Sequence, residues 1–241
     1  MDYKDKLMPE HIAIIVDGNR RWAKKRGLDT KLGHKKGFER LEEIIKYATS
    51  LDIKYISLFV FSTENFNRDK AEVDYLMKIF SNNFRKLAIR MNEENIKVIF
   101  SGSKNLLSDK VKHSMRFMEN LTVENTKAVV NFCLNYGGRE EIVSVCKLIS
   151  KEVRNGMINI DSIDEDLIEC YLYNELPPID LMIRTSGEQR ISNFMLWQLA
   201  YSELYFTETL FPDFKKEDFD AAIVEYGRRD RRFGVNGRVN K

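Results

Sequence analysis

Cysteine, proline and long apolar runs are scarce in this chain of 241 residues. The three cysteines, Cys133, Cys146 and Cys170, are far apart and include no Cys-x-x-Cys pair, which argues against a disulfide framework and a cysteine-based metal site. We expect them to be buried thiols in a reducing compartment. No stretch approaches the roughly 18 apolar residues of a membrane-spanning helix, and residues 1–8 are too charged for a signal peptide. These absences favour a soluble, cytoplasmic protein.

A net charge of one sign is also missing, because 39 basic and 37 acidic side chains leave a formal charge of only +2. No general field therefore attracts nucleic acid. The one dense basic run, residues 20–26, lacks the series of interleaved aromatic side chains on which bases stack. We expect no nucleic-acid partner, so any recognition of anions has to be local.

Linkers rich in proline, glycine or serine are absent as well, although a chain of this length could form one large domain or two small ones. Hydrophobic residues make up 43% of the chain, which is enough for a sizeable core. We therefore predict a single domain over residues 1–241, with flexible ends at residues 1–8 and 235–241.

What the chain does have is a regular alternation of short apolar runs and helix-period segments. The runs are rich in Ile, Val, Phe and Tyr and have the length of buried parallel strands. Such alternation is typical of an α/β fold with a mostly parallel, twisted sheet, here of about six strands, and helices on both faces. We expect strands at residues 11–16, 55–61, 96–101, 127–134, 179–183 and 204–208. We expect helices at residues 34–51, 71–95, 105–121, 139–155, 164–173 and 215–229.

The segment 71–95 is the longest of these helices and carries Phe80, Phe84 and two methionines on its apolar side. Such a stripe is usually the core-facing side of an amphipathic helix. The sharper interpretation makes it one wall of an apolar tunnel. Both interpretations stay open on the pattern alone.

Polar residues gather next to several of the predicted strands. Asp17-Gly-Asn-Arg-Arg follows the first run, Ser62-Thr-Glu-Asn the second and Arg184-Thr-Ser-Gly the run at 179–183, while Glu203 stands directly before the last run. In an open α/β sheet, ligands bind outside the carboxyl ends of the strands. We therefore expect these clusters to share one edge of the sheet. Their carboxylates, guanidinium groups and hydroxyls suit a metal ion and phosphates.

Asp17 and Arg21 carry the clearest chemistry. A strand that ends in Asp-Gly-Asn before a helix-prone Arg-Trp-Ala-Lys-Lys would present backbone N–H groups to a phosphate, and Arg21 adds a planar donor. Asp17 is placed to hold Mg²⁺, which binds through one or two carboxylates and substrate phosphates. A plain turn explains Asp-Gly-Asn alone equally well.

Arg184 and Arg190 indicate a second anion site, because they flank a glycine turn that contains Ser186, with Ser192 two residues further on. Two guanidinium groups and a hydroxyl could clasp a diphosphate. Surface charge is the alternative, but the position after an apolar strand favours the site. His34 is alone at the start of a helical segment, where histidine is more often a structural donor than a catalyst. The chain has no Gly-Lys-Ser/Thr phosphate loop, no Gly-x-Gly-x-x-Gly and no Asp-Asp-x-x-Asp pair.

Six longer motifs stand in a fixed order along roughly residues 9–234, and together they resemble those of the cis-prenyltransferase family, most closely its bacterial undecaprenyl diphosphate synthases. The motifs are His11-Ile-Ala-Ile-Ile-Val-Asp17-Gly-Asn-Arg-Arg-Trp22-Ala, Gly33-His34-Lys-Lys-Gly37, Phe61-Ser62-Thr-Glu64-Asn65-Phe-Asn-Arg68, Asn135-Tyr-Gly-Gly-Arg139, Asp180-Leu-Met-Ile-Arg184-Thr-Ser-Gly-Glu-Gln-Arg190-Ile-Ser192-Asn193-Phe and Trp197-Gln-Leu-Ala-Tyr-Ser-Glu203-Leu-Tyr-Phe.

The resemblance implies an enzyme that condenses isopentenyl diphosphate with an allylic diphosphate such as farnesyl diphosphate. Successive Z-condensations would give a long-chain polyprenyl diphosphate such as undecaprenyl diphosphate, the carrier-lipid precursor for cell-wall synthesis. The resemblance implies Mg²⁺ held by Asp17 and Glu203, with Asp17 catalytic and Asn65 assisting proton removal; a diphosphate oxygen or water is the alternative proton acceptor, because a neutral amide is a poor base. The residues implied in substrate binding are Gly18, Asn19, Arg20, Arg21, Trp22, His34, Ser62, Thr63, Glu64, Phe66, Arg68, Arg184, Arg190, Ile191 and Ser192.

The resemblance also implies an assembly and a location. Members of the family are homodimers, and Arg232 and Gly234 match a C-terminal segment that reaches the partner's isopentenyl diphosphate site. The growing chain would run along a tunnel with helices 34–51 and 71–95 as walls. Because the product is delivered to the membrane, the protein is expected in the cytoplasm or peripherally at the membrane.

Departures from the family pattern keep the primer and the product length open. Thr30 stands where many relatives have Arg, and Val60, Phe132 and Leu134 are bulky enough to shorten the product. One alternative is a short-chain cis-prenyl diphosphate synthase of specialised metabolism. A non-catalytic subunit of a heteromeric prenyltransferase is disfavoured by Asp17 and the arginine set, and a phosphate-binding regulatory module is the third alternative.

Overall fold

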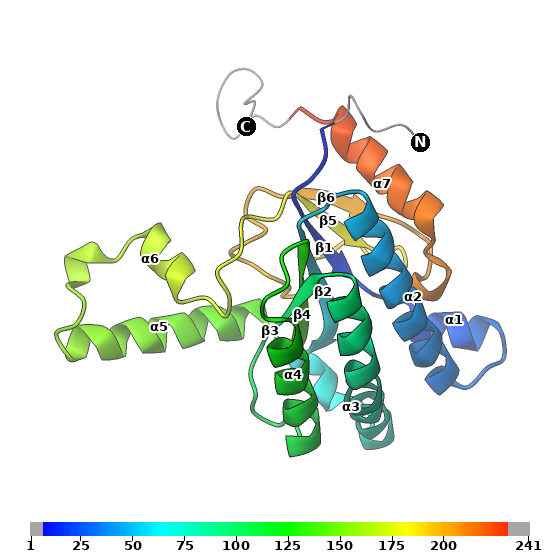
Figure 1. Ribbon diagram of the computed structural model, residues 1–241, viewed down its shortest axis with the longest axis horizontal. Coiled ribbons are helices and arrows are strands. Elements are labelled where there is room, and N and C mark those ends of the chain that lie inside the picture. The colour runs from blue at the N-terminus through cyan, green and yellow to red at the C-terminus, as the bar shows by residue number, and fades with distance from the viewer. Residues whose placement is uncertain (1–6, 231–241) are drawn as a thin grey trace. The chain divides into compact units, whose positions relative to one another are not determined.

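The structure, a computed structural model, describes residues 7–230 (Figure 1). Residues 235–241 and most of residues 1–8, which the sequence predicts to be flexible, lie outside the described residues. Strands and helices alternate along the chain, and six strands form a sheet in the order β3-β4-β2-β1-β5-β6. The predicted α/β fold with a parallel sheet is confirmed.

The chain divides into two compact units that interleave in sequence. The first contains the residues up to Ile56, Pro178–Arg190 and the residues from Gln198 onward, and the second contains Ser57–Pro177 and Ile191–Trp197. Strand β2 (Tyr55–Ser62) begins in the first unit and ends in the second. The single domain over residues 1–241 stays a prediction.

The strands of the first unit are β1 (His11–Ile15), β5 (Leu181–Arg184) and β6 (Glu203–Phe206), which pair in parallel. All five residues of β1 are buried, as expected for a strand covered on both faces. Ile15 is in register with Arg184, and Arg184 with Phe206, so these residues mark the carboxyl edge of the sheet in this unit.

The helices of the first unit are α1 (Asn19–Lys25), α2 (Thr30–Ser50) and α7 (Lys216–Arg228), with a 3₁₀ turn η3 at Phe211–Asp213. Helix α2 begins four residues before the predicted start at residue 34. The carboxylate of Asp29 accepts a hydrogen bond from the backbone N–H of Lys31 at 2.8 Å and so caps the helix earlier than the apolar pattern indicates.

The second unit contains most of β2, β3 (Ile96–Ser101) and β4 (Ala128–Tyr136), and β3 and β4 pair in parallel. Helix α3 (Lys70–Glu93) packs beside α4 (Asp109–Thr122), and a 3₁₀ turn η1 (Thr63–Asn67) follows β2 (Figure 1).

The apolar stripe of α3 faces a cluster of buried phenylalanines. Phe80 lies with its ring centroid 6.4 Å from that of Phe61, and Phe84 lies 5.8 Å from Phe132. For these residues the core-packing interpretation of the stripe is confirmed. A tunnel remains a prediction, because its other expected wall, α2, belongs to the first unit.

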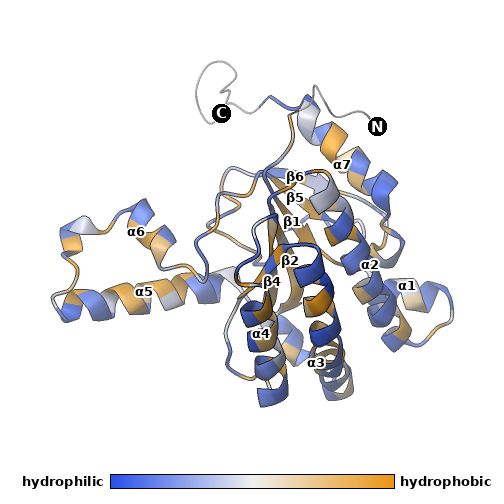
Figure 2. Cartoon of the chain, in the orientation of Figure 1, coloured by the Kyte–Doolittle hydropathy of each residue, from blue (hydrophilic) through white to orange (hydrophobic). Residues whose placement is uncertain are grey.

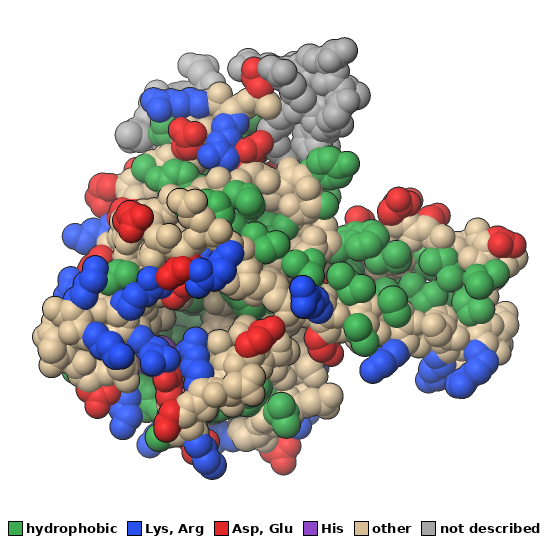
Figure 3. Space-filling view, turned by 180° about the vertical axis from the view of Figure 1, so that it is seen from behind, with side chains coloured by type: hydrophobic (Ala, Val, Ile, Leu, Met, Phe, Trp, Pro, Cys, Tyr) green, Lys and Arg blue, Asp and Glu red, His purple; other side chains and the backbone are tan. Residues whose placement is uncertain are grey.

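Helix α5 (Gly138–Arg154), the turn η2 (Ile160–Ser162) and helix α6 (Glu165–Cys170) extend away from the strands of the second unit (Figure 1). Apolar residues are frequent along both helices (Figure 2), and they form a broad hydrophobic surface on this extension (Figure 3). We call this surface the α5–α6 face. Its large exposed apolar residues are Val143, Leu148, Met157, Ile160 and Ile163.

The expectation of three buried cysteines is wrong for two of them. Cys133 is buried in β4, but Cys146 on α5 and Cys170 at the end of α6 are exposed. Their apolar surroundings in the sequence belong to the α5–α6 face, which the rest of the unit does not cover. Among the described residues, no helix is both long and apolar enough to cross a bilayer.

Candidate active site

Asp17 lies two residues beyond the end of β1, and its backbone is fixed by Thr185, the residue after β5. The N–H of Asp17 donates to Thr185 Oγ1 at 3.0 Å, and the Thr185 hydroxyl donates to the Asp17 carbonyl at 2.6 Å. Because β1 and β5 are parallel neighbours, these two sequence-distant segments meet at the carboxyl edge, as predicted.

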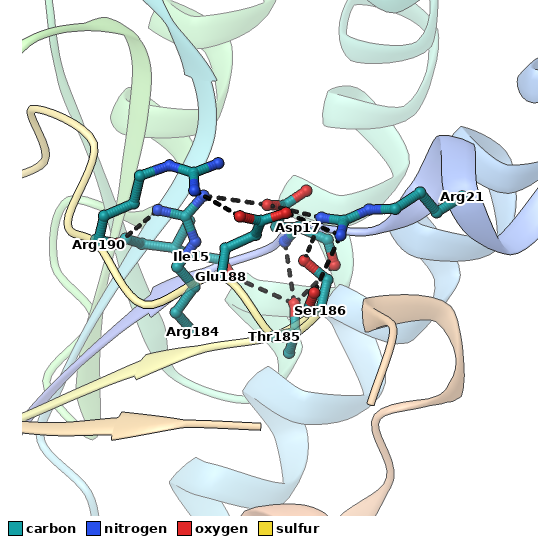
Figure 4. Close-up of polar contacts among 8 residues, drawn as sticks. All are labelled: Ile15, Asp17, Arg21, Arg184, Thr185, Ser186, Glu188 and Arg190. Carbon is teal, nitrogen blue, oxygen red and sulfur yellow. Dashed lines mark hydrogen bonds and ion pairs between the residues drawn. The ribbon is translucent and has the colours of Figure 1, made fainter. Parts of the chain in front are cut away.

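The carboxylate of Asp17 is held by two guanidinium groups (Figure 4). Its Oδ2 lies 3.1 Å from Nη2 of the buried Arg184 and 3.2 Å from Nη2 of Arg21. Burial alone would raise the pKa of Asp17, but the hydrogen bond from Arg184 and the charges of Arg21 and Arg184 hold the pKa below its ordinary value. Asp17 is therefore ionised at neutral pH.

Arg21 also binds the turn that follows β5. Its Nη1 donates to the Ser186 carbonyl at 3.0 Å and to Glu188 Oε1 at 2.9 Å, and its Nη2 donates to the Ser186 hydroxyl at 2.5 Å. Ser186 and Gly187 both have positive φ, 79° and 77°, which bends the chain back toward Arg21. This turn places a hydroxyl and a carboxylate against the same arginine.

Glu188 connects Arg21 to Arg190 (Figure 4). Its other oxygen pairs with the Arg190 guanidinium, and the Arg190 carbonyl accepts a hydrogen bond from Arg184. The hydrogen bond and charge of Arg190 lower the pKa of Glu188. Three arginines and two carboxylates thus form one continuous network around the end of β1.

This network can bind a diphosphate. Guanidinium groups favour phosphate oxygens in bidentate geometry, so an incoming diphosphate would compete with Asp17 and Glu188 for the same N–H donors. Asp17 also fits Mg²⁺, because the ion takes hard oxygen ligands and usually binds through one or two carboxylates plus substrate phosphates. Among residues 7–230, no group of three or more His, Cys, Asp or Glu side chains is arranged to hold a metal ion by itself.

Gly18, between Asp17 and α1, needs to be glycine. Its φ is +107°, and a Cβ there would lie 2.9 Å from Leu210 Cδ2 and 3.1 Å from Ser186 Cβ. Any side chain would therefore push the turn after β5 away from Asp17. The glycine explains how α1, which carries Arg21, can start directly beside the carboxylate.

Two further glycines hold α1 against α2. A Cβ on Gly33 would lie 2.1 Å from the Asn19 carbonyl oxygen, and one on Gly37 would lie 2.1 Å from Asn19 Oδ1. His34 is buried next to Gly33 at this contact. The structure thus brings Asn19 and His34 to one helix crossing, and their role in substrate binding stays a prediction.

Trp22 and Arg20 differ in their surroundings. The indole Nε1 of Trp22 donates to Asp213 Oδ1 at 2.8 Å, and the guanidinium of Arg26 lies 4.4 Å from the centre of the ring. Trp22 therefore anchors α1 to η3, while Arg20 is exposed on α1. Substrate contacts of both residues stay predictions.

We expected Glu203 to share one edge of the sheet with Asp17. This expectation is wrong within a single chain. Glu203 is the first residue of β6 and is in register with Leu181, the first residue of β5, whereas Asp17 binds Arg184 at the far end of β5. That difference is about 10 Å along the strand. The Glu203 carboxylate instead pairs with Arg229 at 2.8 Å. Its role as a metal ligand stays a prediction.

The predicted residues after β2 belong to the second unit and form the turn η1. The backbone N–H of Ser62 donates to Asn65 Oδ1 at 3.2 Å, so the amide oxygen of Asn65 is engaged within its own turn. The amide NH₂ of Asn65 has two donors that remain able to contact a substrate. The Phe66 ring packs edge-on against Phe61, and Arg68 pairs with Glu72 at 3.1 Å.

Asn193 is a residue that the sequence prediction did not include in the site. Its Nδ2 donates to Glu64 Oε1 at 2.9 Å, its Oδ1 accepts from the Arg139 N–H at 2.8 Å, and its carbonyl accepts from the Gly138 N–H at 2.7 Å. Burial raises the pKa of Glu64, but hydrogen bonds, including that from Asn193, outweigh it and lower the pKa. Asn193 therefore fixes the segment that carries Ile191 and Ser192 relative to η1 and α5. The position of Asn193 directly after Ser192 in the motif was the one feature of the sequence that could have indicated its place near the site.

The structure thus groups the predicted residues into two sets. Asp17, Arg21, Arg184 and Arg190 come together in the first unit. The η1 residues, with Thr63 bonded to Glu64 at 3.0 Å, come together with the Ile191–Trp197 segment in the second. One pocket shared by both sets stays a prediction.

Residues 15–234 match the prenyltransferase family described as "Putative undecaprenyl diphosphate synthase". The chain belongs to this family. It is 48% identical over 228 residues to an isoprenyl transferase of Geobacillus kaustophilus, covering 94% of this chain and 89% of the relative. It is 45% identical to a tritrans,polycis-undecaprenyl-diphosphate synthase (geranylgeranyl-diphosphate specific) of Pyrococcus horikoshii, covering 96% and 89% of the two chains.

The fold is shared with a solved prenyl diphosphate synthase. Lavandulyl diphosphate synthase from Lavandula x intermedia, crystallised in complex with dimethylallyl diphosphate, superposes with a TM-score of 0.92 at 39% identity. The comparison covers 94% of this chain and 98% of that one. The family resemblance seen in the motifs is confirmed by sequence and fold alike.

Proposed function

We propose that the protein is a cis-prenyltransferase that condenses isopentenyl diphosphate with an allylic diphosphate, farnesyl diphosphate being the expected primer, in successive steps. The product is a long-chain polyprenyl diphosphate such as undecaprenyl diphosphate. The observation that carries this proposal is the network of Asp17, Arg21, Arg184 and Arg190, whose chemistry is that of diphosphate binding with a divalent cation.

In this mechanism the arginines bind and orient the diphosphates. Arg184 and Arg190 hold isopentenyl diphosphate with Ser192, and Gly18–Arg21 hold the allylic diphosphate. Ionised Asp17 would hold Mg²⁺, which when bound neutralises charge on the leaving diphosphate. The allylic C–O bond breaks as the double bond of isopentenyl diphosphate forms the new C–C bond, and a proton then leaves to give the Z double bond.

Asn65 acts in this scheme as a positioning group. Because its amide oxygen already accepts from the Ser62 N–H, its NH₂ can donate to a diphosphate oxygen, and that oxygen or water takes the proton. Orientation of two substrates and charge stabilisation supply most of the rate enhancement.

A short-chain cis-prenyl diphosphate synthase is the second candidate. The similarity to lavandulyl diphosphate synthase and the phenylalanines that fill the second unit favour it. If the predicted tunnel runs through this unit, these buried side chains would leave less room for a long isoprenoid.

Product analysis tests the proposal. The purified chain is incubated with labelled isopentenyl diphosphate and either farnesyl, geranylgeranyl, geranyl or dimethylallyl diphosphate, with Mg²⁺ or with a chelator, and products are identified by mass spectrometry. We expect a Mg²⁺-dependent series of long products from farnesyl diphosphate. A single condensation would favour the short-chain enzyme, and no condensation with any primer would refute both.

We infer further that the enzyme is a homodimer in which a second copy covers the α5–α6 face. Large apolar side chains are not normally left in such a contiguous exposed group, and Met157 and Ile160 are 74% and 66% exposed. An exposed apolar surface of this kind can pack against its own copy about a two-fold axis. Arg232 and Gly234, expected to reach the partner's site, lie outside the described residues.

Charges placed in the α5–α6 face should separate the dimer. We expect the Met157→Asp/Ile160→Asp variant to sediment as a monomer in analytical ultracentrifugation, because an interface cannot bury unpaired carboxylates without a large cost. The matched control is Leu121→Asp/Val123→Asp, which places two carboxylates on exposed apolar positions at the end of α4. A parent chain that is monomeric at micromolar concentration would contradict the dimer.

A further inference from the structure

An open groove of about 590 Å³ runs along one side of α3 in the second unit. It lies between the first half of α3 and the segment that leads into α4. Its lining combines the apolar side chains of Phe66, Val73 and Met77 with two exposed lysines, Lys78 and Lys110. The volume is within the range of small-molecule sites.

The groove carries excess positive charge. Four basic side chains line it and only one acidic side chain, Asp74, which pairs with Lys70 at 2.6 Å. Arg68 pairs with Glu72. The ammonium group of Lys110 donates a hydrogen bond to the neutral amide oxygen of Asn82 at 3.4 Å, and neither Lys110 nor Lys78 forms an ion pair with a carboxylate among residues 7–230. The ammonium groups of these two exposed lysines are therefore available to an anion.

Leu106 adds an apolar contact at the edge of the groove. Its side chain is 79% exposed, whereas that of the next residue, Leu107, is 4% exposed. The φ of Leu106 is +64°, a left-handed conformation that leucine rarely adopts. Packing within the chain does not explain why a strained backbone presents this leucine to solvent. Such strain is often associated with function.

We propose that this groove binds an anionic phospholipid and docks α3 and α4 on an acidic membrane surface. Exposed apolar side chains combined with flexible lysines are the pattern of interfacial binding, since the apolar group enters the acyl boundary while the ammonium groups meet lipid phosphates. A soluble phosphate would gain nothing from Leu106. The groove includes Phe66 of η1 and Arg68, the residue that directly follows η1. Docking therefore also brings this predicted substrate turn to the bilayer that takes up a polyprenyl product. The delivery of product to the bilayer rests on the proposed function, whereas the docking of the groove on a membrane does not depend on it.

Vesicle binding tests the docking surface. The parent chain is sedimented with vesicles of phosphatidylcholine alone or with about one-third phosphatidylglycerol, at low and high salt. We expect binding to the anionic vesicles that weakens with salt. The Lys78→Gln/Lys110→Gln variant should partition about 25-fold less, since each lysine near the surface contributes roughly fivefold. Leu106→Asn, which keeps a residue that tolerates positive φ, should bind roughly tenfold less.

The matched control is Lys54→Gln/Lys86→Gln, which removes the same charge from exposed positions outside the groove. Equal vesicle binding by the parent and the groove variants, or an equal loss in the control, would overturn the proposal. So would stabilisation of the parent, but not of Lys78→Gln/Lys110→Gln, by inorganic phosphate in the absence of vesicle binding. We expect turnover in lipid-free buffer to stay parental in the groove variants. Absence of turnover in the parent would instead refute the proposed function.

Discussion

The Asp17→Asn variant should lose almost all turnover, with kcat/KM falling by about a thousandfold. The substitution keeps the shape of the side chain and a hydrogen-bond acceptor for Arg184, but it removes the negative charge that the two arginines stabilise. A neutral amide is also a much weaker ligand for Mg²⁺ than a carboxylate. The rate is measured by incorporation of labelled isopentenyl diphosphate across a Mg²⁺ titration.

The variant must be shown to fold, because Arg184 is buried and loses its charged partner. We expect the free energy of unfolding in urea to fall by only about 1–3 kcal/mol, which a domain of ordinary stability tolerates. Asp109→Asn is a suitable control, since that carboxylate is fully exposed at the start of α4. A folded Asp17→Asn protein with the parental rate and the parental Mg²⁺ requirement would contradict the assigned role.

Local patterns were sufficient to predict the sheet but not every residue at its edge. The strands were found because their runs of Ile, Val and Phe are buried on both faces, and Asp17 and Arg184 met because polar residues after parallel strands must share an edge. Glu203 was misplaced because it is the first residue of its strand, and the first residue of a parallel strand lies at the opposite edge of the sheet from the last. The motif shows that Glu203 belongs to the family pattern, but only the register of β5 and β6 shows at which edge of the sheet Glu203 lies.

Contacts between distant segments were the part that the sequence could not supply. Asn193 and Glu64 are 129 residues apart, and nothing in either segment indicates that their side chains meet. The exposure of Cys146 and Cys170 was missed for a related reason. An apolar helix face looks the same in sequence whether its own chain or another molecule covers it.

Arg184→Gln is expected to have the second largest effect, because this side chain joins the Asp17 carboxylate to the Arg190 carbonyl. The variant loses a fixed charged donor for the diphosphate, and we expect kcat/KM for isopentenyl diphosphate to fall by about 10²–10³-fold. Arg184→Lys should recover little of this, since an ammonium group cannot contact both acceptors in the same plane. The matched control is Arg26→Gln. In the parent, the guanidinium of Arg26 is exposed and pairs with Asp213.

The pH dependence of Arg184→Gln distinguishes its effect on Asp17 from a loss of substrate contact alone. In the parent, burial raises the pKa of Asp17, but the lowering by Arg184 and Arg21 is larger than this increase. The carboxylate therefore stays ionised at pH values below its ordinary pKa. A lowered pKa in the folded state contributes stability above the unfolded-state pKa, and this stability is lost as the pH falls through the folded value.

Without Arg184, burial is opposed mainly by Arg21, so the pKa of Asp17 rises. The acid limb of kcat/KM should then move to higher pH, and the free energy of unfolding should depend less on pH in the acidic range. An acid limb that stays in place would mean that Arg184 binds substrate without controlling the protonation of Asp17.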